Sequence, residues 1–584
     1  MRHYFLLVIS IYFFNTASAQ GNDTVYSKKD LPAVNIKGYK AMNGIGRIDN
    51  YSGEIIFSGK KNELLIIDSL NANKALNNTR QIIGRIPGVN IIETESGGFT
   101  ANGISFRGLN PYQTISMNTR QNGYNISADI VGYNEAYYLP ATEAVSGIQF
   151  LRGASGLQFG AQPGGLVNYI LKEASIKPVE IKIAQTVGSY GLYNLYTQAS
   201  GTINKWQYFG FVQYRTLNGW RENSDQKQIS GFGKIKYNAS SKLSLSLEYT
   251  LLRNKIHMPG GLTDSMFYEK PLQSVRARNW LQSPWNIIAS NIEYKISNQT
   301  SVNLKSWYQF SQRNLIWQNE DSWYPNYVPD IIGNPRELER EFFNNITNEL
   351  RILSNYTIGE KQQTISFGVR QSFALMRKME GGPGDSGTAL DLTQKGPYAT
   401  DMNFKTNNLA FFAENIFHVN KKLSITPGFR FEYLQTNAYG YAENKDISTS
   451  SNTPTLYIDN QKSTRTFFLS GLSLQYQLSS KINMYGNFSQ SYRPVTYSDL
   501  TPFGTSAIIN QNLKDSKTNN ADLGIRGQLK NVLNFDISVF YLSVNNQIAT
   551  VPKTNANGSP YFFVTNVGSD RHIGIETYGE LNIL

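Results

Sequence analysis

Repeated stretches of polar and apolar alternation, which begin near residue 176, constrain the fold of this chain more than any other feature. In residues 243–251, leucine and tyrosine alternate with serine, glutamate and threonine. Residues 423–433 repeat the pattern with aliphatic and aromatic side chains against Ser, Thr, Arg and Glu. Because successive side chains of a β-strand point to opposite faces, this period of two predicts many strands with one apolar face.

Short turn sequences and long polar loops separate these stretches. NASSK, VNKK and LSSK are short turns, whereas the longest predicted loops are His257–Trp285 and Glu380–Lys405. Such alternation is typical of a membrane barrel, in which strands of about ten residues cross the bilayer and every backbone group is paired. A soluble β-sandwich or propeller is the alternative. The aromatic content of 13% favours the barrel, because aromatic residues line both membrane interfaces.

Composition argues against several other classes of protein. The chain has no cysteine, which excludes disulfides, iron–sulfur clusters and thiolate zinc sites. Three histidines beyond the first residues, His257, His418 and His572, are far apart in sequence, so we predict no metal site. Because no catalytic motif or phosphate-binding loop stands out, we predict no catalytic residue, no cofactor and no enzyme activity.

The first 19 residues have the three parts of a secretory signal. Arg2 supplies the positive charge, residues 4–14 an apolar stretch, and residues 17–19 a small-residue cleavage site, so we predict export with cleavage before Gln20. A short membrane anchor is the alternative, but this stretch is too short to cross the bilayer as a helix.

Residues 21–175 differ in composition and carry ordered glycine motifs. Ser69 is placed to cap a helix that Pro87-Gly88 would close. The glycines that follow predict tight turns and close backbone contacts. The motifs are IPGV at 86–89, ISFRG at 104–108 and a glycine series at 152–165, and they include Pro87, Gly88, Arg107, Gly108, Arg152, Gly153, Gly164 and Gly165.

In their order and spacing these motifs resemble the plug domain of TonB-dependent outer-membrane receptors. Residues 485–500, 513–527 and 567–576 resemble the late strands of the same receptors. Within that family, residues 119–140 and 259–280 look most like receptors of the ferric dicitrate type.

The resemblance implies an all-β transmembrane antiparallel barrel with an N-terminal α+β plug domain in its lumen. Its divisions here are a signal peptide at 1–19, an N-terminal extension at 20–45, the plug at 46–175 and the barrel at 176–584. It also implies a monomer in the outer membrane of a Gram-negative bacterium. Expected partners are the periplasmic TonB complex, a small iron chelate, outer-membrane lipid and lipopolysaccharide, but no nucleic acid.

Receptors of this family pair a short extended segment with the energy-coupling protein as an added strand, so that backbone hydrogen bonds supply the affinity. The best match is Leu31, Pro32, Ala33, Val34, Asn35 and Ile36. Residues 23–27 are the second match, and an ordinary disordered tail is the alternative for either. The short interval between residues 19 and 31 leaves no room for a separate periplasmic signalling domain, so we predict none.

Charge chemistry guides the choice of ligand residues. Ferric citrate is polyanionic, arginine binds carboxylates bidentately, and the formal net charge of +12 suits an anion funnel. We predict ligand contacts from the plug apex and from the first long loop, with citrate rather than a side chain holding the iron. A solvated loop charge or a lipopolysaccharide contact is the alternative for each arginine. The predicted residues are Arg120, Gln121, Asn125, Gln273, Arg276, Arg278 and Trp280.

Three other arginines, Arg107, Arg152 and Arg493, are interpreted as structural, because they lie in turns or on predicted wall strands. Two other functions remain open at this point. One is import of another siderophore, haem, cobalamin or an oligosaccharide by the same fold, and the other is a non-transport surface barrel.

The chain departs from the family pattern at its end. We count roughly 17 or 18 candidate strands after residue 178, whereas plugged transporters have about 22. The chain ends on Leu584, where receptors of this family continue and usually finish on an aromatic residue. We therefore expect a C-terminally truncated receptor with an incomplete barrel.

Overall fold

A computed structural model describes most of the chain after residue 43. The described residues are 44–70, 72, 79–92, 103–111, 114–129, 131–153, 155–318, 330, 332–445, 454–500, 507–510, 512–529, 532–555, 558 and 560–582. The predicted signal peptide and both candidate energy-coupling segments lie outside these residues. No helix within them is long and apolar enough to cross a membrane.

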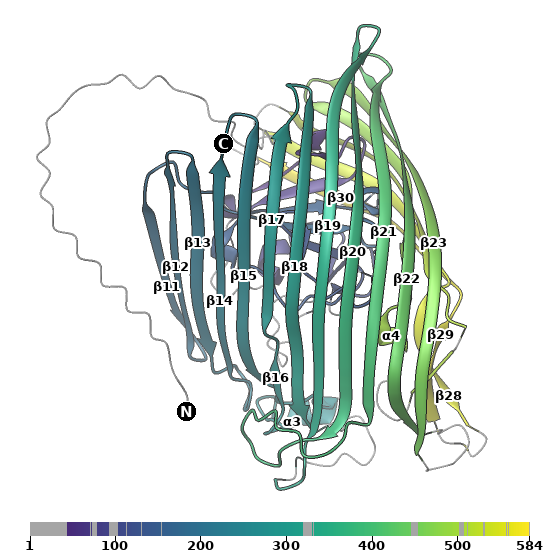
Figure 1. The fold of residues 1–584 in the computed structure, drawn as a ribbon. Coiled ribbons are helices and arrows are strands. Elements are labelled where there is room, and N and C mark those ends of the chain that lie inside the picture. The colour runs from purple at the N-terminus through teal and green to yellow at the C-terminus, as the bar shows by residue number, and fades with distance from the viewer. Residues whose placement is uncertain are drawn as a thin grey trace, which may run out of the picture. The chain divides into compact units, whose positions relative to one another are not determined.

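A 17-stranded antiparallel sheet forms the wall of the fold, with its strands neighbouring one another in chain order (Figure 1). Within the described residues no ladder joins the first strand to the last. The strands are β11 (Glu180–Gly188), β12 (Leu192–Ile203), β13 (Trp206–Leu217), β14 (Gln226–Asn238), β15 (Leu243–His257), β16 (Trp280–Gln282), β17 (Trp285–Lys295), β18 (Thr300–Trp317), β19 (Glu337–Ile358), β20 (Lys361–Pro383), β21 (Thr400–His418), β22 (Leu423–Lys445), β23 (Pro454–Ser479), β24 (Ile482–Arg493), β26 (Ser516–Leu529), β27 (Leu533–Asn545) and β30 (Ser569–Leu581).

The apolar face of the wall points outward. Along β15, Leu245, Leu247 and Tyr249 are exposed, whereas Glu248 and Thr250 on either side of Tyr249 are buried. The same alternation runs along β22, where Phe429 and Phe431 are exposed and Glu432 is buried. A sheet with apolar side chains outside and polar ones inside is the arrangement of a membrane barrel. The predicted all-β antiparallel fold is confirmed.

The strands are longer than the ten residues that we expected. β19, β20, β22 and β23 have 22, 23, 23 and 26 residues. The expected loop at Glu380–Lys405 is therefore shortened to residues 384–399, because β20 and β21 continue into it. The expected loop at His257–Trp285 contains α3 (Asp264–Glu269) and β16.

Short turns and long loops lie at opposite ends of the wall. Tight turns join β12 to β13, β19 to β20 and β23 to β24, and this end is called the turn end. The other end, called the loop end, carries α3 and a three-stranded sheet of β25 (Ala507–Ile509), β28 (Ile548–Thr554) and β29 (Pro560–Asn566). In Figure 1 the loop end lies at the bottom.

The plug is a small α+β unit whose elements appear in purple and blue behind the front strands of Figure 1. Its main sheet has the order β1-β4-β9-β10-β7-β8, with β7 and β10 parallel. Its elements are β1 (Ile45–Gly46), β2 (Tyr51–Ser52), β3 (Ile55–Ile56), β4 (Asn62–Ile66), η1 (Ile67–Ser69), α1 (Thr79–Ile83), β5 (Val89–Ile91), β6 (Ile104–Phe106), β7 (Asn118–Gln121), β8 (Tyr124–Asn125), η4 (Thr142–Ala144), β9 (Val145–Leu151), α2 (Gly156–Phe159) and β10 (Leu166–Leu171).

One apolar core joins the plug to the wall. Ile148 and Val167 of the plug sheet are fully buried in the same cluster as Trp285 and Phe343 of the wall. The Trp285 indole N–H donates to the carbonyl of Ile126 in the plug at 3.2 Å. The plug therefore packs directly against the inner face of the wall.

The helix expected from Ser69 to Pro87 is wrong at its start. β4 runs directly into the 3-10 turn η1, and Ser69 is the last residue of that turn rather than a helix cap. Ile67 and Leu70 are buried, so this turn is fixed by packing into the core rather than by capping. Within the described part of this segment, the α-helix is α1 alone, and the turn at Gly88, with a φ of 72°, follows it.

Candidate ligand site and plug interface

Two plug arginines are bound by carboxylates of the wall. Arg107 is bonded to Asp522 on β26, and its Nε donates to Glu576 on β30 at 3.1 Å. Arg152 lies between Glu63 at 2.8 Å and Glu576 at 2.7 Å. All these groups are buried. Arg107 and Arg152 therefore hold the plug against β26 and β30, so their guanidinium groups face carboxylates rather than a ligand.

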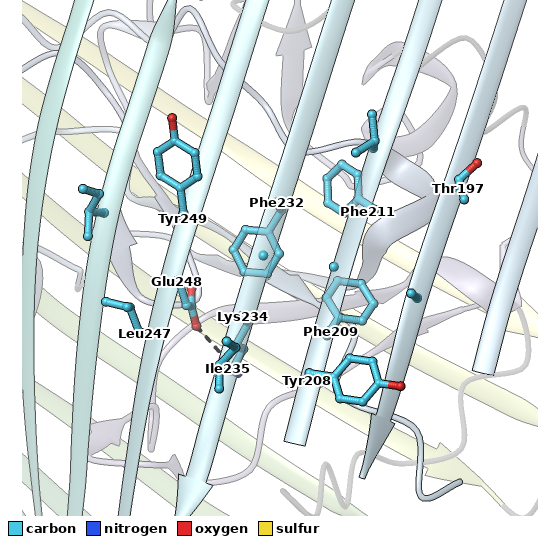
Figure 2. A pocket seen from close by; sticks show the side chains of 15 residues that line it. Thr197, Tyr208, Phe209, Phe211, Phe232, Lys234, Ile235, Leu247, Glu248 and Tyr249 are labelled. Atoms are coloured by element: carbon cyan, nitrogen blue, oxygen red, sulfur yellow. Dashed lines mark ion pairs between the residues drawn. The ribbon is translucent and has the colours of Figure 1, made fainter. Parts of the chain in front are cut away.

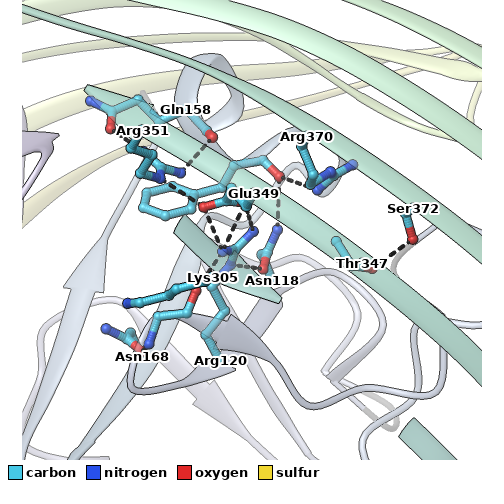
Figure 3. A network of polar contacts seen from close by, with 12 residues as sticks. Asn118, Arg120, Gln158, Asn168, Lys305, Thr347, Glu349, Arg351, Arg370 and Ser372 are labelled. Atoms are coloured by element: carbon cyan, nitrogen blue, oxygen red, sulfur yellow. Dashed lines mark hydrogen bonds and ion pairs between the residues drawn. The ribbon is translucent and has the colours of Figure 1, made fainter. Parts of the chain in front are cut away.

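A second polar network joins the plug to β19 (Figure 3). The guanidinium of Arg120 lies 3.3 Å from Glu349 and donates to the carbonyl of Gly123 at 2.6 Å. Arg351 donates to Glu349 at 2.7 Å and to the plug side chain of Gln158 at 2.9 Å. Burial lowers the pKa of Arg120 to about 10, although Glu349 opposes the shift.

The predicted plug ligands lie in this interior rather than at an open apex. Arg120 is completely buried. Gln121 donates to Thr250 of the wall at 3.1 Å and accepts from Tyr138 at 2.8 Å. Asn125 is buried and accepts from Ser127 at 2.9 Å. Ligand contacts by Arg120, Gln121 and Asn125 stay a prediction, and each would need the plug to move.

Two lysines of the plug complete its polar attachment. Lys60 forms an ion pair of 2.6 Å with Glu414 on β21, and Lys61 forms one of 2.8 Å with Asp536 on β27. These pairs were not predicted from the sequence. A usable signal was present, because Glu349, Glu414, Asp522, Asp536 and Glu576 all fall on the polar face of alternating strands.

The predicted loop residues bind neighbouring loops at the loop end. Arg278 is completely buried and lies 2.7 Å from Asp330, and it donates to two carbonyls, those of Asn334 at 2.9 Å and Ser386 at 3.0 Å. The indole of Trp280 donates to the carbonyl of Thr388 at 2.7 Å. These bonds connect the loop that contains Arg278 and Trp280 to the segment before β19 and to the segment after β20.

The two other predicted loop residues are also engaged locally. Gln273 donates to the carbonyl of Met266 at 2.6 Å, and Arg276 is buried and donates to the carbonyl of Val275 at 2.9 Å. Gln273, Arg276, Arg278 and Trp280 thus lie in one loop. The structure does not bring them together with Arg120, whose partners lie in the plug and on β19.

A cavity of about 560 Å³, which was not predicted from the sequence, opens near the loop end of the wall and is lined by wall strands and the loops between them. Tyr497 of α4 (Tyr497–Leu500) lines it and joins it to the plug, since its backbone N–H donates to Gly132 at 2.7 Å. The lining residues are Thr436, Ala438, Gln461, Ser463, Arg465, Thr466, Phe467, Val495, Tyr497, Leu500, Leu513, Lys514, Asp515, Lys517 and Asn546.

Positive charge dominates this cavity. Arg465, Lys514 and Lys517 line it together with a single carboxylate, Asp515. Arg465 donates to Asp515 at 2.6 Å and to the hydroxyl of Thr436 at 3.2 Å, while its buried Nε has no hydrogen-bond partner among the described residues. A partly buried guanidinium with a free N–H can bind an anionic group of a ligand.

Direct metal binding is not supported by the described residues. None of them forms a group of three or more His, Cys, Asp or Glu side chains that could hold a metal ion.

Comparison with known proteins identifies both domains. Residues 68–166 match the TonB-dependent receptor plug domain, and residues 205–583 match the TonB-dependent receptor-like β-barrel. The crystal structure of the ferric citrate transporter FecA in the unliganded form is similar at 19% identity and a TM-score of 0.73, over 90% of this chain and 75% of that one.

Other solved structures share the fold. The ferric-catecholate import receptor Fiu from E. coli K12 is 14% identical with a TM-score of 0.70, over 91% of this chain and 79% of that one. The copper transporter OprC is 13% identical with a TM-score of 0.70, over 90% and 76%. These likenesses concern the fold. The match to the β-barrel description covers most of the chain, and the chain therefore belongs to the family of TonB-dependent receptors.

Proposed function

We propose that this chain imports a ferric chelate, with ferric dicitrate as the favoured solute, across the outer membrane of a Gram-negative bacterium. The family consists of transporter receptors rather than enzymes. The observation that carries the choice of solute is the cationic cavity beside the plug, where Arg465, Lys514 and Lys517 outnumber Asp515. Such a site suits a polycarboxylate, because arginine and lysine bind carboxylates with charge-assisted hydrogen bonds.

The proposed organisation is a signal peptide at 1–19, an extension at 20–45, a plug at 46–175 and a barrel at 176–584, working as a monomer. Energy would reach the plug from the TonB complex through the segment at 31–36. Binding at the cavity would loosen Tyr497 from Gly132, because Tyr497 lines the cavity and its backbone N–H donates to the carbonyl of Gly132 in the plug.

Ligand binding by purified protein tests the proposed solute. Arg465→Gln and Lys514→Gln should each weaken ferric citrate binding by about 1.5–3 kcal/mol, the value of a charged hydrogen bond. Lys462→Gln is the matched control, since Lys462 is an exposed neighbour on the same strand and does not line the cavity. Unchanged affinity in Arg465→Gln and Lys514→Gln would contradict the proposal.

The loop and plug residues named from the sequence form a second candidate set. Arg276→Ala and Arg278→Ala are also expected to weaken binding by about 1.5–3 kcal/mol if they contact citrate. Arg278 already binds Asp330, so Asp330→Asn separates the two explanations. Weakening by Arg278→Ala and by Asp330→Asn alike would indicate loss of loop structure rather than loss of a ligand contact.

Another iron chelate is the second candidate solute. Phe467 and Tyr497 line the same cavity as Arg465, and aromatic rings favour a catecholate siderophore or haem. Competition of unlabelled ferric catecholate and haem against ferric citrate distinguishes the ligands. A ligand that displaces ferric citrate at a tenth of its concentration would replace it as the proposed solute.

The energy-coupling segment is tested by removing one backbone donor. Val34→Pro should abolish uptake while leaving ligand binding intact, because proline cannot donate to an added strand. Val25→Pro is the control in the second candidate segment, at 23–27. Uptake lost in Val25→Pro and kept in Val34→Pro would move the segment to residues 23–27.

A further inference from the structure

A small polar cavity, called here the inner cavity, lies between the plug and the inner face of the wall. Its volume is about 10 Å³, which is the space of one water molecule or one monatomic ion. The transported chelate is therefore too large to enter it while the plug is in place. The lining residues come from the plug and from β18, β19 and β20, and they are Asn125, Asp129, Trp307, Asn345, Thr347, Arg370 and Ser372.

Two buried N–H groups in this lining have no partner. Arg370 and Asn125 are 1% and 5% exposed, and among the described residues nothing accepts from the Nε of Arg370 or the Nδ2 of Asn125. The other nitrogens of Arg370 are occupied, since Nη1 donates to the carbonyl of Phe159 at 3.1 Å and Nη2 donates to Asn408 at 2.7 Å. Because buried donors without an acceptor are unfavourable, these groups indicate that the inner cavity holds an acceptor.

Two hydroxyl groups of the wall supply a further donor. Thr347 and Ser372 are paired across β19 and β20, and their Oγ atoms lie 2.8 Å apart (Figure 3). One hydroxyl donates in this bond, so the hydrogen of the other is left to donate elsewhere. The carboxylate of Asp129 is already engaged, because it accepts from the N–H of Val131 at 3.1 Å and from the hydroxyl of Thr406 at 2.9 Å. The unpaired groups of the lining named here are therefore all donors.

Positive charge is in excess around the inner cavity. Four guanidinium groups share two carboxylates, and all six side chains are buried. The pairs are Arg120 and Arg351 with Glu349, and Arg370 and Arg430 with Glu432. Asp129 in the lining is a third carboxylate, which leaves an excess of one positive charge. Since an unpaired buried charge is costly, one monovalent anion would stabilise this cluster.

Cations are not in excess at another place on the inner face. Lys234 on β14 lies 3.6 Å from Glu248 on β15 (Figure 2) and 3.1 Å from Glu173. Two carboxylates thus face one ammonium group there. The excess of cations is a feature of the cluster around Arg370 rather than of the inner face as a whole.

Water and chloride are the two occupants of suitable size. A buried water molecule donates hydrogen bonds as well as accepting them, whereas chloride only accepts. The unpaired donors and the excess of positive charge both favour the anion. Phosphate, sulfate and carboxylates have several heavy atoms and exceed the volume of the inner cavity.

We propose that the inner cavity binds one chloride ion between the plug and the wall. The Nε of Arg370 and the Nδ2 of Asn125 donate to the ion, together with the free hydroxyl of the pair formed by Thr347 and Ser372. Because Asn125 belongs to the plug and Arg370 to the wall, the ion connects the two and stabilises the plug in its seat. The proposal does not depend on which solute the chain imports.

Thermal unfolding of the purified full chain in detergent tests this proposal, with sodium chloride replaced stepwise by sodium gluconate at constant ionic strength. Gluconate is too large for the inner cavity. The melting temperature of the wild type should rise with chloride and level off after a gain of about 2–4 °C, and bromide should have the same effect. Asn125→Asp should lose this dependence, because its second carboxylate oxygen takes the place of the anion beside Arg370.

The matched control is Asn420→Asp, which adds the same charge in an exposed turn at the turn end. Its carboxylate can still accept from the N–H of Leu423, as Asn420 does at 2.8 Å, so it should keep the wild-type response to chloride. The proposal is overturned if the melting temperature of the wild type does not respond to chloride. It is also overturned if Asn125→Asp responds as the wild type does.

A second measurement uses the wild type alone and is decisive if Asn125→Asp does not fold. Crystals of the full chain grown in sodium bromide should give an anomalous peak at the bromine absorption edge, within hydrogen-bond reach of the Nε of Arg370. An inner cavity without that peak, whether it is empty or filled by an ordered water molecule, would overturn the proposal.

Discussion

Buried charged residues determine how the plug is attached to the wall. Arg152 bridges Glu63 of the plug and Glu576 of β30, and all three side chains are buried. Desolvation makes each of these charges costly, so the attachment depends on every partner being present. Such a set can be stable only while the plug is in place, which couples the position of the plug to the pairing of these charges.

Removing one cation of this buried set should therefore lower the free energy of unfolding more than removing an exposed cation. Arg152→Ala leaves Glu63 and Glu576 without it and should lower the free energy of unfolding by about 3–5 kcal/mol. Arg377→Ala is the control, because Arg377 is half-exposed in its pair with Asp401, and that pair should contribute only about 0–1 kcal/mol. Chemical unfolding in detergent measures both. Equal losses in the two variants would show that the buried set does not stabilise the plug.

Glu135 of the plug gives the protein a pH dependence near neutrality. Burial raises its pKa from 4.5 to about 7, and nearby Glu341 adds to the shift. The hydroxyl of Tyr137 and the charge of Arg313 oppose it. The folded state thus binds a proton that the unfolded state releases between pH 4.5 and 7, so stability is lost as pH rises through that window.

We expect Glu135→Gln to be free of this loss of stability as pH rises. The melting temperature of the wild type, relative to Glu135→Gln, should fall as pH is raised from 5 to 8. Glu173→Gln serves as the control, since Glu173 is largely exposed. A wild-type melting temperature that changes in parallel with that of Glu135→Gln over this range would refute the assignment.

The roles of single residues were predictable where a local motif contains them. They were not predictable where the role depends on a partner that is distant in the sequence. The R-G motifs indicated structural roles for Arg107 and Arg152, and both bind carboxylates. Arg120 was expected at an open apex, but its partner Glu349 lies 229 positions away in the sequence. No local pattern contains that pairing, because it depends on which strands surround the plug.

At the scale of elements, alternation predicted the strands but not their lengths. The period of two in residues 243–251 and 423–433 lies within β15 and β22. Alternation has no stop signal of its own, so β20 and β21 extend into residues that were expected to form a loop. The helix expected from Ser69 failed because β4 passes directly into η1.

The turn before β4 depends on a close approach to the wall. Gly59 has a φ of 71°, and a Cβ there would lie 2.8 Å from Ser473 Cβ on β23. Gly53 has a φ of 54° but open space around it. Gly53→Ala should cost about 1–2 kcal/mol of backbone strain, whereas Gly59→Ala should cost about 1–3 kcal/mol more from overpacking. Urea unfolding compares the two, and equal costs would contradict the close approach.

The whole molecule was predictable to the level of its family. The motifs at 86–89, 104–108 and 152–165 identified the plug, and alternation identified the surrounding wall. The cavity beside Tyr497 was not foreseen, because its lining comes from β22, β23, β26 and the loops between them. Segments so far apart in the sequence meet only through the sheet order.

At the scale of the whole molecule, the plug lies against the inner face of the wall and is held by buried charges. The chain has no cysteine, so an engineered pair can report this directly. A Cβ at Gly153 would lie 3.3 Å from Asn520 Cβ on β26, close to the spacing of about 3.5–4.5 Å in a disulfide. Ala521 is the neighbouring residue and faces outward.

Mass spectrometry after mild oxidation of the Gly153→Cys/Asn520→Cys double variant is the most direct measurement. The structure predicts an intramolecular disulfide in nearly all molecules, and none in the Gly153→Cys/Ala521→Cys control. Free thiols in the first pair, or a disulfide in the control pair, would contradict the placement of the plug inside the wall.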